Sequence, residues 1–228
     1  MLKTPNKPPR NLRIIYEDRD LLVVNKPAGL LTSTVPREKR PTLLAMVREY
    51  LYQTDRRARM GLIHRLDKDA SGLLVFSKQP AAYESLKTQF FRHTVTRLYT
   101  AVVQGTLDPQ RGIIRSRLIE RADGTVYSTH KHAAGQIAET EYEVLGKMAN
   151  GRLLVQVKLQ TGRKHQVRVH LSERGAPIVG DSMYGKADKA GLHLAATTLA
   201  FDHPRTGKRV EFHAEAPFGV SLHGVKER

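Results

Sequence analysis

The chain has 228 residues, of which 40% are hydrophobic and 26% charged, values that are typical of a folded globular protein and exclude a disordered or collagen-like chain. Its 38 Lys and Arg against 22 Asp and Glu give a net charge of +16, which favours a polyanionic partner, RNA or DNA before an anionic membrane surface. Cysteine is absent, which excludes disulfides and zinc sites with sulfur ligands, and no apolar run approaches the roughly 20 residues that span a bilayer.

The first 13 positions contain four basic residues, Lys3, Lys7, Arg10 and Arg13, and three prolines, Pro5, Pro8 and Pro9. They predict a basic flexible arm over residues 1–13, with an organelle transit peptide as the alternative. No hydrophobic segment follows that would make a signal peptide, so we expect a cytoplasmic protein, or one of an organelle matrix if the source is eukaryotic. Regular structure is expected from Ile14, in one compact domain over residues 14–228.

The first half of this domain predicts two short strands, then two helices with a strand between them. The strands are expected at Ile14–Tyr16 and Leu21–Asn25, around a polar turn. Thr42 can cap a helix whose apolar residues recur at helical spacing, and Pro80 suits the first turn of a second helix. Between the helices, a polar loop leads into the apolar run Leu73–Phe76, which predicts a buried strand.

After residue 97 the pattern is mainly that of strands. They are expected at Tyr99–Val103, Ile113–Leu118, Ala138–Leu145, Leu153–Leu159, Leu192–Phe201 and Arg209–Ala214. Asp123-Gly124 and Asn150-Gly151 indicate hairpin turns, and Thr161–Arg174 predicts a helix that stops at Gly175. Because strands and helices do not alternate regularly, we expect an α+β fold with a largely antiparallel sheet and not a doubly wound fold.

Two polar segments are candidates for chemistry. Residues 61–74 mix acidic, basic and small side chains directly before the buried strand, although a solvated turn has the same composition. Residues 161–171 gather cationic and imidazole groups at an expected helix start, where phosphate binding is favoured, and a charged exposed face is the alternative. Arg168 lies between two core-facing positions of this segment, so its guanidinium needs an acidic partner.

Three blocks of sequence stand out in chain order. They are Lys26-Pro27-Ala28-Gly29, then His64-Arg65-Leu66-Asp67 followed by Ser71-Gly72-Leu73, and then Gly162-Arg163-x-His165-Gln166-x-Arg168-x-His170. Together with Tyr99 and the segment Asp181-x-x-Tyr184-Gly185, they resemble the signature motifs of the RluA family of pseudouridine synthases. The likeness runs from about Ile14 to Ala216. It implies the pseudouridine synthase fold, a mixed, largely antiparallel bent sheet flanked by helices and loops, in a compact member without the family's extra N-terminal RNA-binding domain.

The resemblance also implies roles for individual residues. Asp67 is the essential carboxylate, Tyr99 the ring that packs on the target uracil, and Arg168 the cation paired with Asp67. The implied reaction detaches uracil from C1′, turns the bound base and rejoins it through C5, with no cofactor and no metal. Asp67 can act as a nucleophile or as a base that removes a sugar proton, and both roles need an ionised carboxylate, which an Arg partner favours.

Such an enzyme has to flip its uridine out of the base stack. Arg65 can fill the vacated stack or contact a phosphate, and the sequence leaves both roles open. His64, Arg163, Lys164 and His165 are the other expected RNA contacts near the motifs. Further candidates, each of which can equally be a solvated surface charge, are Arg56, Arg57, Arg59, Arg92, Arg111, Arg115, Arg117 and Lys131.

The expected function is therefore RNA pseudouridine synthesis by a monomeric isomerase, in large-subunit ribosomal RNA, in tRNA or in both. A non-catalytic RNA-binding protein is the alternative, but it has little use for a carboxylate at position 67, which repels phosphate. The ten histidines raise a metal hydrolase or nuclease as another class. No His-Glu-x-x-His motif or comparable ligand cluster supports that class.

Overall fold

The computed structural model describes residues 12–34, 40–129 and 134–219. Residues 1–11 of the expected basic arm, and Lys131 among the expected RNA contacts, lie outside the described residues. Arg13, the last residue of that expected arm, is the first residue of strand β1 (Arg13–Glu17). The expectation of a single domain over residues 14–228 stays a prediction.

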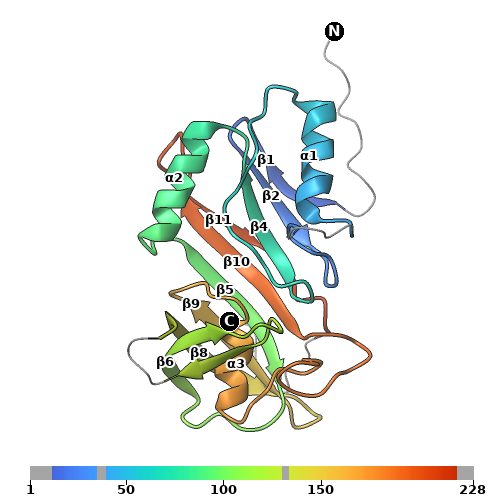
Figure 1. Cartoon of the computed structure of the whole chain (residues 1–228), viewed down its shortest axis with the longest axis vertical. Helices are drawn as coiled ribbons and strands as arrows, with labels where there is room; N and C mark the ends of the chain where they lie inside the picture. Colours follow the sequence, from blue (N-terminus) through green and yellow to red (C-terminus); the bar gives the residue numbers. More distant parts are fainter. Residues whose placement is uncertain (1–11, 35–39, 130–133, 220–228) are drawn as a thin grey trace. The chain divides into compact units, whose positions relative to one another are not determined.

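The chain packs into two compact units, which are drawn in Figure 1. Unit 1 consists of Met1–Val95 and Thr198–Glu215, and unit 2 of Thr96–Thr197 and Ala216–Arg228. Strand β10 (Leu194–Asp202) contributes its first residues to unit 2 and its last residues to unit 1.

Unit 1 is built on short antiparallel strands. In addition to β1 and the end of β10 they are β2 (Leu21–Lys26), β3 (Gly61–Leu62), β4 (Ser71–Ser77) and β11 (Arg209–His213). The order is β1-β2-β4-β10, with β3 also on β4 and β11 on β10. All seven residues of β4 are buried, which confirms the buried strand expected from its apolar run. A hydrophobic core cluster of unit 1 is formed by Leu21, Val23, Leu73, Val75, Ala82, Leu86, Val95, Leu199 and Phe201.

The two helices of unit 1 begin where the sequence predicts. α1 (Leu43–Thr54) is capped by Thr42, whose Oγ1 accepts a hydrogen bond from the Ala45 amide at 3.1 Å. α2 (Pro80–Phe91) starts on its proline and buries Leu86 against the core.

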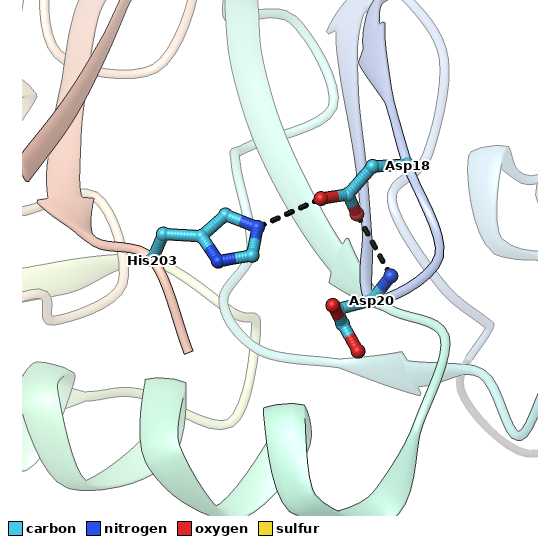
Figure 2. Close-up of side chains that lie close together, drawn as sticks. All are labelled: Asp18, Asp20 and His203. Atoms are coloured by element: carbon cyan, nitrogen blue, oxygen red, sulfur yellow. Dashed lines mark hydrogen bonds and ion pairs between the residues drawn. The ribbon is translucent and has the colours of Figure 1, made fainter. Parts of the chain in front are cut away.

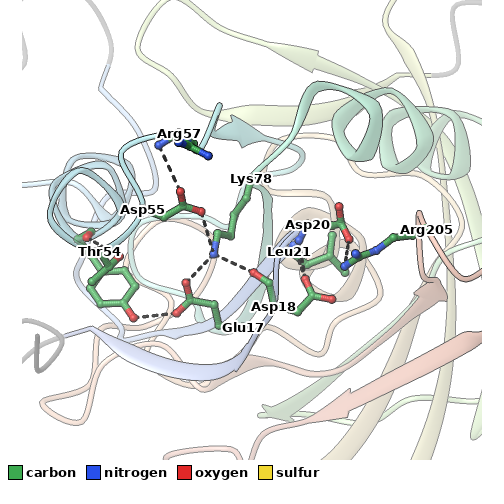
Figure 3. Close-up of polar contacts among 10 residues, drawn as sticks. Glu17, Asp18, Asp20, Leu21, Thr54, Asp55, Arg57, Lys78 and Arg205 are labelled. Atoms are coloured by element: carbon green, nitrogen blue, oxygen red, sulfur yellow. Dashed lines mark hydrogen bonds and ion pairs between the residues drawn. The ribbon is translucent and has the colours of Figure 1, made fainter. Parts of the chain in front are cut away.

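Ion pairs of the buried Lys78 connect the end of α1 to the turn between β1 and β2 (Figure 3). The ammonium of Lys78 lies 2.8 Å from Glu17 Oε1 and 3.5 Å from Asp55 Oδ2, and it donates to the Asp18 carbonyl at 2.8 Å. The hydroxyl of Tyr50 donates to Glu17 Oε2 at 2.7 Å. Because the buried Lys78 ammonium has three partners, its charge is compensated, and the cluster connects the end of β4 with α1 and with the turn after β1.

Unit 2 carries a second run of antiparallel strands. They are β5 (Thr96–Val103), β6 (Arg111–Glu120), β7 (Val126–Thr129), β8 (Gln136–Lys147), β9 (Leu153–Leu159) and the start of β10. Their order is β10-β5-β9-β8-β6-β7. Both predicted hairpins are confirmed, with Gly124 and Gly151 at φ +84° and +78° in the turns. β7 is four residues long and carried no strand signal beyond the turn that precedes it.

The helix expected over Thr161–Arg174 is shorter than predicted. α3 spans Gln166–Glu173, because His165 has φ +53° and therefore interrupts a helical backbone. The preceding residues form a turn in which the Gln166 side-chain oxygen accepts from the Thr161 hydroxyl at 2.8 Å and from the Arg163 amide at 3.0 Å. The predicted stop at Gly175, with φ +75°, is confirmed.

The structure confirms the α+β class, since antiparallel strands dominate and α1, α2 and α3 are the α-helices of the described residues. None of these helices combines the length and the apolar character that a membrane crossing requires.

Candidate active site

Asp67 lies in unit 1, in the loop that joins β3 to β4. Leu66 before it and Ala70 after it are buried, so the loop is anchored in the core on both sides of the half-buried Asp67. The Thr32 hydroxyl donates to the Leu66 carbonyl at 2.8 Å and accepts from the Leu66 amide at 3.2 Å. The peptide groups of the residue that precedes Asp67 are thus held by one buried side chain.

Lys26 holds the chain on the other side of Asp67. Its ammonium donates to the carbonyls of Lys68, Leu30 and Pro27 at 2.9, 2.8 and 3.0 Å. The side chain is fully buried, and this burial lowers the pKa of Lys26 to about 8, although the charge of Asp67 and then that of Asp69 act in the opposite direction. The lysine of the first motif is therefore a cation inside unit 1 that interacts electrostatically with Asp67.

The two residues expected to contact RNA beside Asp67 are placed differently. Arg65 is exposed. His64 packs on the ring of Phe90, with centroids 4.8 Å apart, and its Nε2 accepts a hydrogen bond from the Val75 amide at 3.3 Å. His64 thus has a structural role in unit 1, and RNA contact by either residue stays a prediction.

Tyr99 and Arg168, the other expected catalytic residues, belong to unit 2. Tyr99 lies on β5 and pairs in register with Val157 of β9. Arg168 lies on α3, with its side chain 5% exposed. Its predicted pairing with Asp67 joins residues of different units and stays a prediction.

Arg168 has an acidic partner within unit 2, Asp181, while the expected pairing with Asp67 stays a prediction. Nε and Nη2 of Arg168 donate to Oδ2 and Oδ1 of Asp181, both at 2.8 Å, and the Asp181 side chain is completely buried. Oδ1 also accepts from the amides of Met183 and Tyr184. Burial raises the pKa of Asp181, but the hydrogen bond and charge of Arg168 outweigh it and lower the pKa below its ordinary value. The sequence contained a signal for this pair, because Asp181 opens the last family-like segment.

A buried polar network connects the third motif, residues 162–170, to strands β6 and β8. Gln166 Nε2 donates to the Glu139 carbonyl and to Thr140 Oγ1, both at 2.9 Å. His170 is fully buried, with Nδ1 2.8 Å from Thr140 Oγ1 and Nε2 2.9 Å from Ser116 Oγ. Burial lowers the pKa of His170 to about 4, so its ring is neutral at neutral pH. Two residues of the motif therefore fasten α3 to β6 and β8.

The cationic residues of this motif all contact protein groups. Lys164 forms an ion pair with Glu120 at 2.5 Å, and Arg163 Nε donates to the Ile137 carbonyl at 3.0 Å. His165 Nδ1 lies 2.8 Å from the Tyr184 hydroxyl. Since these groups already have partners, RNA contact by them stays a prediction that requires the partners to be shared or exchanged.

Two of the further arginines that were considered as RNA contacts form ion pairs with glutamates on the neighbouring strand. Arg111 and Arg115 of β6 lie 3.2 and 2.6 Å from Glu143 and Glu139 of β8, across the strand pair. Arg117 Nη1 donates to the Gly135 carbonyl at 3.1 Å. These contacts favour the alternative interpretation, a solvated surface charge, over a phosphate contact.

Within the part of the chain that the structure describes, Asp18, Asp20 and His203 bring three possible metal ligands together (Figure 2). Asp18 Oδ1 already accepts from the amides of Asp20 and Leu21, both at 2.7 Å, and Oδ2 lies 2.7 Å from His203 Nε2. Arg205 is paired with Asp20 Oδ2 at 2.5 Å, as Figure 3 also shows. A cation would have to displace these partners. We therefore interpret the cluster as a structural contact that joins two turns of unit 1.

Comparison with known proteins agrees with this arrangement of motifs. The family model described as RNA pseudouridylate synthase matches residues 20–173. A protein of Bacillus subtilis strain 168 that is named uncharacterized RNA pseudouridine synthase YlyB is 41% identical over 215 residues, which cover 92% of this chain and 70% of that protein. The ribosomal large subunit pseudouridine synthase D of Zymomonas mobilis is 36% identical, with 92% of this chain and 71% of that protein covered. The chain therefore belongs to the RNA pseudouridylate synthase family, in its RluA-type branch, and is an RNA-modifying isomerase.

Solved structures show the same fold. Human RNA pseudouridylate synthase domain containing 4 matches with a TM-score of 0.75 at 23% identity, over 90% of this chain and 89% of that chain. Human RNA pseudouridylate synthase domain containing 1 matches with a TM-score of 0.72 at 28% identity, over 91% of this chain and 84% of that chain. The expected pseudouridine synthase fold is confirmed.

Proposed function

We propose that Asp67 is the carboxylate that isomerises the target uridine. The observation that supports this proposal is the double anchoring of its loop, in which Thr32 holds Leu66 and Lys26 holds Lys68. A reaction is faster when its reacting groups are held in a fixed orientation. A catalytic carboxylate therefore needs such a rigid support, whereas the carboxylate of a solvated turn does not. Asp67 itself stays half-buried between the two anchored residues.

The reaction breaks the bond between C1′ and N1 of uridine, turns the base and joins C5 to C1′, while a proton leaves C5 and one is gained at N1. Asp67 serves it as a nucleophile at C1′ or as a base that removes a sugar proton. Tyr99 is proposed as the flat surface for the turning base, a contact worth roughly 1–3 kcal/mol in other stacking platforms.

Arg168 is proposed to direct its charge at Asp67, as the family resemblance implies. Asp181 supports this role because two parallel hydrogen bonds fix the plane of the guanidinium. Arg65, exposed and two residues before Asp67, is proposed to fill the stack or to contact a phosphate when the uridine flips out.

Large-subunit ribosomal RNA is the proposed substrate, and the cytoplasm the proposed place of action. Relatives named ribosomal large subunit pseudouridine synthase D support the choice of substrate, at 36% identity in Zymomonas mobilis and at 34% in Pseudomonas aeruginosa. A tRNA target is the second candidate.

Pseudouridine mapping tests the choice of substrate. Ribosomal RNA and tRNA from cells with and without the gene are compared at nucleotide resolution, and both are then treated with the purified protein. We expect at least one uridine of the large-subunit RNA to lose its modification in the deleted strain and to regain it in vitro. Loss confined to tRNA would contradict the ribosomal assignment and leave the reaction type intact.

A further inference from the structure

The hydroxyl of Thr32 makes two hydrogen bonds to the backbone of a single residue. It donates to the Leu66 carbonyl at 2.8 Å and accepts from the Leu66 amide at 3.2 Å, across 34 residues of sequence. Thr32 is 2% exposed and Leu66 6%, so solvent does not compete for these groups. The Thr32 side chain thus satisfies the backbone amide and carbonyl of Leu66, as a neighbouring strand would, immediately before Asp67.

This contact depends on the chemistry of a hydroxyl. One hydroxyl group both donates and accepts, whereas an aliphatic side chain of the same shape does neither. Replacing Thr32 by valine would leave the amide and the carbonyl of Leu66 buried without this partner. Buried backbone groups avoid that state, so the loop is expected to shift until they find another partner.

Thr32 is itself held in place by α1. The amides of Leu43 and Leu44, in the first turn of the helix, donate to the carbonyls of Leu31 and Thr32 at 2.8 and 3.0 Å. Thr42, which caps this helix, also pairs with Leu31 in an isolated parallel β-bridge. The start of α1, Thr32 and Leu66 therefore form a continuous hydrogen-bonded connection that ends one residue before Asp67, all within unit 1.

We propose that Thr32 is a positioning residue for pseudouridine formation: its hydroxyl fixes the backbone at Leu66 and thereby the place of the Asp67 carboxylate. The inference rests on the proposed function, because it matters for the reaction only if Asp67 reacts. Lys26 holds the opposite side of the loop by its bond to the Lys68 carbonyl, and Thr32 provides the support on the side of Leu66.

Single-turnover and steady-state kinetics on a uridine-containing RNA test the proposal with Thr32→Val and Thr32→Ser. Thr32→Val should lower kcat by roughly 10- to 100-fold and change KM by less than about twofold, since misplacing a reacting group slows chemistry and leaves RNA contacts in place. Thr32→Ser keeps the hydroxyl and should restore most of kcat. Thr32→Ala, which leaves room for a bridging water, should fall between them and gives a second comparison with Thr32→Ser if the valine variant does not fold.

Tyr50→Phe is the matched control. It also removes a hydroxyl that donates from a largely buried side chain of unit 1, but at Glu17 and not at the loop of Asp67. It should lower the thermal midpoint without lowering kcat. Equal loss of kcat in Tyr50→Phe and Thr32→Val would reduce Thr32 to a general stabilising residue and overturn the proposal.

Asp67→Asn, measured in parallel, separates the two claims. An inactive Asp67→Asn with full kcat in Thr32→Val would refute the positioning role alone. An active Asp67→Asn would refute the proposed function, whatever the Thr32 variants do.

Discussion

Arg168 and Asp181 illustrate what single residues contribute, because each would be costly to bury alone. The bidentate contact neutralises two side chains that are 5% and 0% exposed, and Asp181 also accepts two backbone amides. The ring of Tyr184 lies against the guanidinium, with its centroid 5.1 Å from Arg168 Cζ. The pair therefore joins α3 to the segment around residue 181. Removing it should lower the free energy of unfolding.

We expect Arg168→Met to lower the free energy of unfolding by about 3–5 kcal/mol, because it leaves a buried carboxylate without its counter-charge. Arg168→Met combined with Asp181→Asn should recover most of this loss, since the asparagine oxygen still accepts from Met183 and Tyr184. Denaturant unfolding measures both variants, and product formation should stay low in both if Arg168 takes part in the reaction. If Arg168→Met alone were as stable as the parent, the ion pair would contribute little to the free energy of unfolding.

Among the elements, α3 depends on polar contacts with the sheet as well as on apolar packing. Thr140 of β8 lies between Gln166 and His170, and Ser116 of β6 lies at the other nitrogen of His170. Because the ring is fully buried, a proton on His170 would have to be accommodated without solvent. We therefore expect the attachment of this helix to the sheet to depend on pH.

His170 should make stability fall on acidification. Its pKa is about 4 in the folded protein and near 6.5 when exposed, so the unfolded chain takes up a proton between these values and the folded chain does not. The contribution is full above pH 6.5 and is lost as the pH falls toward 4, by at most about 3 kcal/mol. Denaturant unfolding at several pH values, compared with His170→Gln, measures it. Parallel pH profiles for the parent and the variant would exclude this role.

For the whole molecule, the sequence predicts what depends on local pattern. The longer strands, the Thr42 cap, the hairpin turns and the stop at Gly175 follow from residues close together in the chain, whereas the short strands β3 and β7 were not predicted. The start of α3 was misplaced because the backbone at His165 depends on tertiary contacts, those of its own ring with Tyr184 and of the Gln166 side chain with Glu139 and Thr140.

The supports of the candidate site were missed for a similar reason. The contact of Thr32 with Leu66 spans 34 residues, and that of Arg168 with Asp181 spans 13. No periodicity connects such positions. The resemblance named Asp67 as the partner of Arg168, and the bidentate pair with Asp181 was not predicted. Thr32 carried no signal that distinguishes it from any other loop threonine.

The net charge of +16 also describes the whole molecule, but it does not locate the RNA. Arg111, Arg115 and Lys164 each form an ion pair with a glutamate. Net charge thus supports an RNA partner through long-range attraction, while the identity of the contacts depends on the motifs.

The comparison of Asp67→Asn with Asp69→Asn tests the central claim most directly. Both changes remove one negative charge from the same loop, and both carboxylates interact with Lys26. Single-turnover pseudouridine formation and RNA binding are measured side by side. We predict that Asp67→Asn loses roughly a thousandfold or more in rate while it binds RNA as the parent does, and that Asp69→Asn stays close to the parent in both. Pseudouridine formation by Asp67→Asn at the parent's rate would contradict the account.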